Sequence, residues 1–195
     1  MLALKKEAIL ICCVLLTCIG CATNGQYKRQ VLEAYYQALQ ATDPHKNEIL
    51  QPGSEKEQAA IERFTYLLAH FTEDNIKRYV RDVYAPNAYY RDSFTAKQGV
   101  ENIEIYYIQG TQTMHELAFE LQDVAVHDGN YYFRWITQFS PKGKEDDVIH
   151  LPGISHVRFD KEGRVIFEQD FWDAGVIYER LPIIGFFIRW LKKQA

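Results

Sequence analysis

ISHVRFDKEGRV, residues 154–165, is the stretch that decides the fold of this 195-residue chain. A strand-like run ends at Phe159, Asp160-Lys161-Glu162-Gly163 has the composition of a tight turn, and a second strand-like run begins at Val165. On both sides of this stretch the same pattern repeats, with turn residues between strand-like runs. The sequence therefore predicts four successive antiparallel strands: Met114 to Val126, Tyr131 to Phe139, Val148 to Phe159 and Val165 to Trp172.

Helical patterns precede these strands. Ser54 and Glu57 have the spacing of a capping box, which predicts a helix from there to about His70. Apolar residues at helical spacing predict a second helix over Thr72–Tyr84, and Val100–Gln109 lies between glycines as a third. A short aromatic strand, Asn87–Phe94, separates the second and third helices. This order predicts an α+β domain with helices packed on one face of a curved sheet.

Three stretches in this order resemble the nuclear transport factor 2-like superfamily, which includes ketosteroid isomerases, SnoaL-like cyclases and limonene-epoxide hydrolases. They are Tyr89-Tyr90-Arg91-Asp92-Ser93-Phe94, Gly99-Val100-Glu101-Asn102-Ile103-Glu104-Ile105-Tyr106-Tyr107, and residues 154–165. The resemblance implies a cone-shaped, curved antiparallel sheet with three helices packed on it. The concave face of such a sheet forms an apolar pocket. We expect this domain over residues 54–180.

Strand alternation suggests which side chains face that pocket. Phe133, Trp135 and Phe139 share one face of their strand and are its more apolar set. The resemblance adds Ser155 from the next strand, and Trp172, with Glu168 and Asp170, from the last. The residues predicted to bind a ligand are Phe133, Trp135, Phe139, Ser155 and Trp172. The alternative is that the aromatic side chains simply fill the cone as a packed core.

Asp92 is the candidate general base, because it matches the position at which the resembled isomerases carry their catalytic carboxylate. Asp170 and Tyr107 are the candidate helpers. Phe64 and Ser155 occupy the positions of the isomerase oxyanion-hole donors, so steroid isomerisation itself is disfavoured. Two structural alternatives stay open. Asp92 would form a turn ahead of Ser93, and Asp170 would form an ion pair with Arg158 or Arg164.

The sequence gives little support for a metal site, for epoxide hydrolysis or for binding of nucleic acid. The four histidines after residue 100 show no metal-ligand spacing, so no metal site and no cofactor are predicted. An epoxide hydrolase would need an acid close after Arg134, where Ile136 stands. The formal net charge of −4 and the pI near 5.9 argue against nucleic acid as a partner.

The N-terminus resembles a bacterial lipoprotein leader. Lys5 and Lys6 precede a short apolar run that ends at Gly20-Cys21. We expect residues 1–20 to be a signal peptide, Cys21 to carry lipid, and residues 21–53 to form a tether with an accessory helix. The lipobox position held here by Cys18 is usually Leu, and the alternative is an uncleaved anchor. By resemblance to the lipoprotein sorting rule, Ala22 favours the outer membrane, with the protein facing the periplasm.

Residues 181–195 have the pattern of an amphipathic C-terminal helix, with large apolar side chains at helical spacing and Arg189, Lys192 and Lys193 behind them. We expect it to pack as a lid over the mouth of the cone; lying on a membrane surface is the alternative. The sequence thus predicts a membrane-anchored lipoprotein that binds a small hydrophobic ligand or a protein partner, with homodimer formation left open. The alternative is a SnoaL- or isomerase-type enzyme using Asp92 as a base on a hydrophobic carbonyl or epoxide substrate.

Overall fold

The computed structural model describes residues 30, 32–181 and 183–194. The predicted signal peptide and Cys21 lie outside these residues. The chain divides into two units, and the boundary in the sequence falls between Ala41 and Thr42. In the first unit residues 32–41 are helical, within the stretch for which an accessory helix was predicted. Every other element belongs to the second unit.

The second unit is built on a six-stranded sheet with the order β2-β1-β6-β5-β4-β3. The strands of the predicted antiparallel run are confirmed as β3 (Met114–His127), β4 (Asn130–Pro141), β5 (Ile149–Phe159) and β6 (Val165–Trp172). The predicted aromatic strand is β1 (Tyr84–Arg91), and a short strand that the sequence analysis missed, β2 (Ala96–Gln98), pairs with it. The sheet is not wholly antiparallel as expected, because β1 runs parallel to β6.

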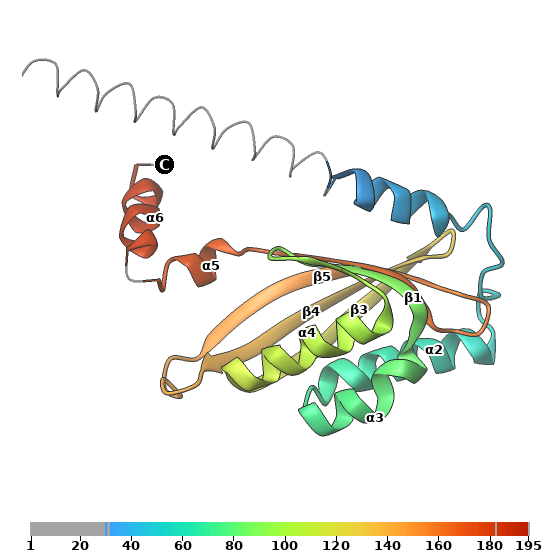
Figure 1. Ribbon diagram of the computed structural model, residues 1–195, viewed down its shortest axis with the longest axis horizontal. Helices are drawn as coiled ribbons and strands as arrows, with labels where there is room; N and C mark the ends of the chain where they lie inside the picture. Colours follow the sequence, from blue (N-terminus) through green and yellow to red (C-terminus); the bar gives the residue numbers. More distant parts are fainter. Residues whose placement is uncertain (1–29, 31, 182, 195) are drawn as a thin grey trace, which may run out of the picture. The chain divides into compact units, whose positions relative to one another are not determined.

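Three helices lie together on one side of this sheet, as Figure 1 shows: α2 (Glu55–Ala69), α3 (Glu73–Val83) and α4 (Val100–Thr113). The Ser54 hydroxyl accepts the backbone N–H of Glu57 at 3.1 Å and caps α2, as predicted. The Glu57 carboxylate reaches one residue further back than in a standard capping box and accepts the N–H of Gly53 at 2.6 Å. Mixed α and β elements on a curved sheet confirm the predicted fold.

Helix α2 and the strands β4 and β5 enclose a packed aromatic core. Phe64 of α2 lies against Phe133 of β4, with ring centroids 4.7 Å apart, and meets Phe159 of β5 edge-on. The predicted alternation of β4 is confirmed, since Tyr131, Phe133 and Trp135 are buried. Phe133 is fully buried in this core, so it is not the ligand-contacting residue that the sequence analysis expected. The cavity described below lies further along β4, towards Thr137 and Phe139.

The chain ends in two short helices, α5 (Gly175–Tyr178) and α6 (Ile184–Lys192). The expected C-terminal helix is present, but its large side chains are exposed, with Phe186 62% and Trp190 53% accessible. The expected lid is therefore wrong, because a lid would bury these side chains against the domain. Within residues 30, 32–181 and 183–194, no helix has the length and apolarity needed to cross a membrane.

Candidate functional site

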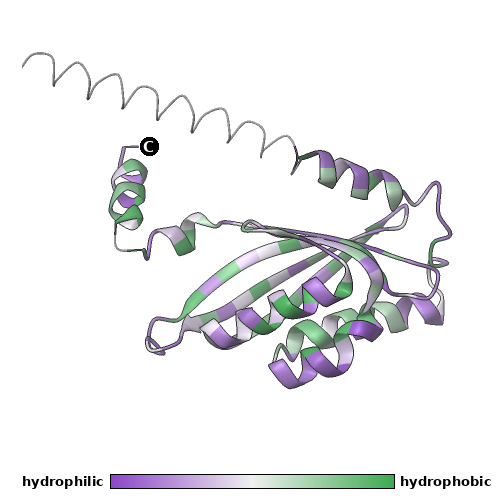
Figure 2. Ribbon diagram, in the orientation of Figure 1, coloured by the Kyte–Doolittle hydropathy of each residue, from purple (hydrophilic) through white to green (hydrophobic). Residues whose placement is uncertain are grey.

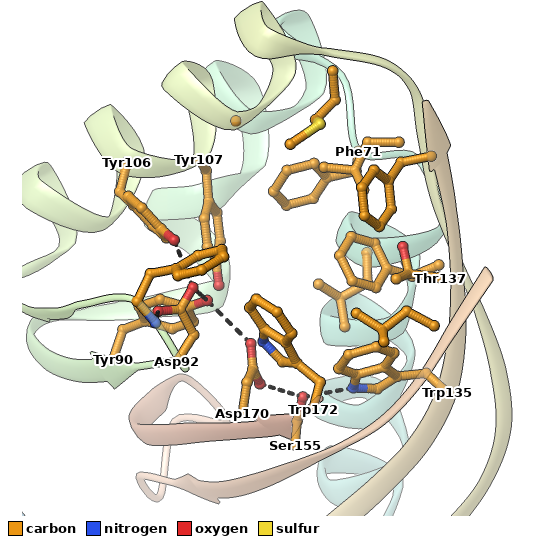
Figure 3. Close-up of a pocket in the computed structure, with 18 of the residues that line it drawn as sticks. Phe71, Tyr90, Asp92, Tyr106, Tyr107, Trp135, Thr137, Ser155, Asp170 and Trp172 are labelled. Atoms are coloured by element: carbon orange, nitrogen blue, oxygen red, sulfur yellow. Dashed lines mark hydrogen bonds between the residues drawn. The ribbon is translucent and has the colours of Figure 1, made fainter. Parts of the chain in front are cut away.

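A cavity of about 350 Å³ opens between the concave face of the sheet and α4 (Figure 3). One wall is apolar and largely aromatic: Phe71, Phe119, Trp135, Phe139, Leu151 and Trp172. The indole of Trp135 lies across Gly153 of β5, where an added Cβ would come within 2.1 Å of the ring. Glycine at this cross-strand position lets the ring lie flat against the strand and leaves the space in front of it open.

Polar side chains gather on the other side of the cavity (Figure 3). Three acids form what we call the carboxylate cluster: Asp92, which follows β1, and Glu168 and Asp170, which share one face of β6. The Tyr90 hydroxyl lies between two of them, 3.1 Å from Asp170 Oδ2 and 3.4 Å from Asp92 Oδ2. The structure therefore brings the two predicted carboxylates to one site.

Asp92 is held by hydrogen bonds on both oxygens. Its Oδ1 accepts the backbone N–H groups of Phe94 and Thr95, both at 2.8 Å, and its Oδ2 accepts the Tyr106 hydroxyl at 2.5 Å. The turn-forming role that was left open for this residue is therefore confirmed, alongside its position on the cavity wall. With the longer contact from Tyr90, donors occupy the acceptor positions of a carboxylate. Asp92 is well placed to fix tyrosine hydroxyls and poorly placed to take a proton from a ligand.

Asp170 is less fully bonded. Its Oδ1 accepts the Ser155 hydroxyl at 2.6 Å, and Ser155 Oγ in turn accepts the Trp135 indole N–H at 2.9 Å. Burial raises the pKa of Asp170 to about 6, helped by the negative charge of Asp92, although the Ser155 hydrogen bond acts in the opposite direction. A pKa near neutrality is the property needed to exchange a proton with a ligand.

The ion pair left open for Asp170 is wrong. Arg164 pairs instead with Asp160 across the β5–β6 turn, at 3.0 Å. Arg158 donates to Asn130 at 2.7 Å and to Thr42 at 3.1 Å.

Glu168 lies deeper, fully buried, and shares a short hydrogen bond with the hydroxyl of Tyr84, which is 2.7 Å from the Tyr107 hydroxyl. Burial and the neighbouring Asp170 raise the pKa of Glu168 well above its usual range, which favours the protonated form of this carboxyl. With the carboxylate, Tyr84 donates to Glu168; with the protonated form, Glu168 can donate to Tyr84 and Tyr84 to Tyr107. When Glu168 is the donor to Tyr84, the hydroxyl hydrogen of Tyr107 can point into the cavity.

Most of the predicted site residues line this cavity. They are Asp92, Asp170, Tyr107, Trp135, Phe139, Ser155 and Trp172. The prediction omitted Tyr90 and Tyr106 and gave Glu168 no role. Strand alternation carried a signal for Tyr90, which stands two residues before Asp92, and for Glu168, which stands two residues before Asp170. Helical spacing does not single out Tyr106 from the other partly buried positions of its helix.

The composition of the lining limits what can bind. Among the described residues, none of those lining the cavity is Lys, Arg or His. In the part of the chain that the structure describes, no group of three or more His, Cys, Asp or Glu side chains is arranged to hold a metal ion. The site consists of an apolar wall, hydroxyls, acids and the amide of Gln109.

The fold is that of a nuclear transport factor 2-like domain. A family model for the SnoaL-like domain matches residues 61–167, and the chain belongs to this family. None of the curated proteins matches the sequence at a significant level.

Solved structures show the same fold. A protein from Jannaschia sp. CCS1, classed as a SnoaL-like polyketide cyclase, is similar with a TM-score of 0.56 at 17% identity, covering 65% of this chain and 94% of that one. A ketosteroid isomerase-like protein from Catenulispora acidiphila, in complex with trimethylamine, has a TM-score of 0.53 at 15% identity, over 60% and 89%. An LEH-like epoxide hydrolase from M. tuberculosis has a TM-score of 0.52 at 11% identity, over 66% and 90%.

Proposed function

We propose that this domain binds a small, uncharged and largely apolar molecule in its cavity, with one polar atom placed at Asp170. The observation that carries the proposal is the position of Asp170, a half-buried carboxyl with a pKa near 6 at the edge of an otherwise apolar wall. Aromatic side chains supply the contact area, and a protonated Asp170 donates to a carbonyl or hydroxyl oxygen of the ligand. Such a combination of apolar wall and few polar groups is typical of ligand pockets.

The charge of the cavity favours an uncharged ligand over an anion. An anionic group would enter a low-dielectric space beside Asp92 and Asp170 with no cation to neutralise it. A carbonyl, by contrast, needs only the proton of Asp170. We therefore expect ketones, esters or epoxides of aromatic or terpenoid size rather than carboxylates or phosphates.

Calorimetry with a matched pair of probes tests this proposal. We expect 2-acetylnaphthalene to bind, and 2-naphthoate, which has the same ring system and a negative charge, to bind at least about tenfold more weakly. Binding of the ketone should weaken as the pH rises through about 6, because the ligand favours the protonated form of Asp170. In Asp170→Asn this pH dependence should disappear, while it persists in Asp146→Asn, an exposed control. Equal affinity for the two probes would contradict the proposal.

Acid–base catalysis is the second candidate function, and the pair of Asp170 and Tyr107 favours it. In its ionised form Asp170 would take the proton from the carbon beside a carbonyl, and the C–H electron pair would form an enolate. The enolate oxygen would accept a hydrogen bond from Tyr107, and Asp170 would then return the proton to carbon. This assigns the base to Asp170 and gives Asp92 the task of holding Tyr106 and Tyr90.

Deuterium exchange distinguishes catalysis from binding alone. Protein in deuterated buffer should accelerate exchange of the methyl protons of 2-acetylnaphthalene, with a rate that rises with pH to a plateau above about 6. Asp170→Asn should abolish the acceleration, and Tyr107→Phe should reduce it by about a hundredfold. If the ketone binds but its exchange rate stays at the background value, the domain is a binding protein.

The location of the domain is part of the proposal. A leader that ends at Gly20-Cys21 supports attachment to the periplasmic face of a membrane through lipid on Cys21. Cys21→Ser should abolish metabolic labelling with palmitate and leave an unprocessed precursor. Labelling that survives this substitution would contradict the anchor.

A further inference from the structure

Helix α6 contacts its own chain through its polar side. The backbone carbonyl of Glu179, just beyond α5, accepts a hydrogen bond from the guanidinium of Arg189, and the Glu179 carboxylate pairs with Lys192. Gly185 is buried over the same carbonyl, since a Cβ at this position would lie 2.0 Å from the oxygen. The polar side of the helix is therefore the side that faces the protein.

The opposite side of α6 carries large apolar side chains that face solvent. At 100° per residue these positions fall in one continuous arc around the helix axis, away from Gly185, Arg189 and Lys192. Figure 2 shows the hydrophobic residues that recur along α6. More than half of each side chain in the arc is accessible: Ile183, Ile184, Phe186, Phe187, Trp190 and Leu191.

This arrangement is the reverse of the usual one in a water-soluble domain, where an amphipathic helix turns its apolar side inward. The contacts of α6 with Glu179 stabilise this outward orientation of its apolar side. Turning the apolar arc towards the domain would break both interactions of that residue and move Gly185 off the carbonyl that it contacts. A large side chain could not take the place of Gly185, so the sequence supports the outward orientation.

We propose that α6 lies in the surface of an anionic lipid bilayer. Its aromatic and aliphatic arc would enter the boundary between headgroups and acyl chains, and its cations would lie at headgroup level. Charge complementarity supports this occupant, because residues 181–195 contain Arg189, Lys192 and Lys193 and no acid, so these cations outnumber Glu179, the acid that pairs with Lys192. Phe and Trp on one side with Lys and Arg on the other is the composition of interfacial helices. The proposal does not depend on what the cavity binds.

Fluorescence of Trp190 tests the proposal in the full chain. Because Trp190 lies on α6, its signal reports on this helix and not on an anchor at the N-terminus. Of the three tryptophans, Trp135 is buried and Trp172 is partly buried in the cavity wall, whereas Trp190 is exposed. Vesicles of brominated phosphatidylcholine mixed with phosphatidylglycerol should quench Trp190, and the quenched component should be missing in Trp190→Phe. Vesicles without phosphatidylglycerol should quench it less.

Variants give the size of the effect. Phe186→Ser should weaken the insertion of α6 by about tenfold or more, because the variant lacks a phenylalanine ring that the bilayer would bury. Phe171→Ser removes another exposed ring, 53% accessible against 62% for Phe186, from the outer face of β6 and should leave quenching unchanged. Lys193→Gln should weaken insertion about fivefold, the effect of one cation near an anionic surface.

Two results would overturn the proposal. Trp190 that stays unquenched on anionic vesicles shows that the arc does not enter lipid. A Trp190 emission that shifts to the blue with rising protein concentration before any vesicle is added shows that a second copy of the chain covers it.

Discussion

Replacing Asp170 with Asn should stabilise the protein at neutral pH, although it alters the proposed site. The folded-state pKa of Asp170 is raised from 3.8 to about 6, which means that the fold favours the protonated form of this carboxyl. The unfolded chain favours the carboxylate. Stability from this group is therefore fully present below about pH 4 and is lost as the pH rises to about 6.

The magnitude follows from the size of the pKa change. A rise of about two pKa units corresponds to about 3 kcal/mol, which the wild-type protein loses once Asp170 is ionised. Asn cannot ionise, so it avoids this cost. Its amide nitrogen cannot accept, so one of the hydrogen bonds from Ser155 and Tyr90 is lost, at about 1 kcal/mol. The net gain is about 2 kcal/mol at neutral pH, which is about 4 to 8 °C in melting temperature for a chain of this length.

Thermal unfolding of Asp170→Asn and wild type at about pH 7.5 and about pH 4 measures this effect. The variant should be more stable at the higher pH and equal or slightly less stable at the lower. Asp146→Asn, an exposed acid in the β4–β5 loop, should follow wild type at both. A variant that is destabilised at the higher pH, or that keeps the wild-type pH dependence, would refute the argument that burial raises this pKa.

Two further substitutions test the cavity wall. Gly153→Ala should destabilise the fold by about 1 to 3 kcal/mol in denaturant unfolding, because its Cβ collides with the Trp135 ring, whereas Gly110→Ala in α4, where nothing lies within 4 Å, should stabilise by up to about 1 kcal/mol. Ser155→Ala should raise the pKa of Asp170 above 6 when followed by carboxyl NMR, since the Ser155 hydroxyl lowers it; an unchanged value would contradict that hydrogen bond.

Much of the fold could be predicted from the sequence because its signals are local. Turn residues between alternating runs indicated the β3 to β6 meander, and Ser54 and Thr72 marked the starts of helices whose caps are present. The parallel pairing of β1 with β6 joins residues about eighty positions apart and has no local signal. The three-residue strand β2 is too short to show a period.

The site was predicted in outline, and the roles within it were not. Alternation placed Trp135 on the cavity face, and the family resemblance placed Trp172 there. Neither could say how deep in the cone each position lies, so Phe133 was assigned to the ligand. The different roles of Asp92 and Asp170 depend on which hydrogen-bond donors reach each carboxylate oxygen. Most of those donors come from other helices and strands, so their positions could not be predicted from the local sequence. The orientation of α6 depends likewise on its contacts with Glu179.

The methyl group of Met114 offers the most direct test of the central claim that the cavity receives an uncharged apolar ligand. Met114 lines the cavity, and the chain has one other methionine, Met1, so methyl-labelled methionine gives a resonance that Met114→Leu identifies. Titration with 2-acetylnaphthalene should shift the Met114 resonance in a saturable way, and 2-naphthoate at the same concentrations should leave it in place. A Met114 resonance that the ketone does not move, or that both compounds move equally, would contradict the claim.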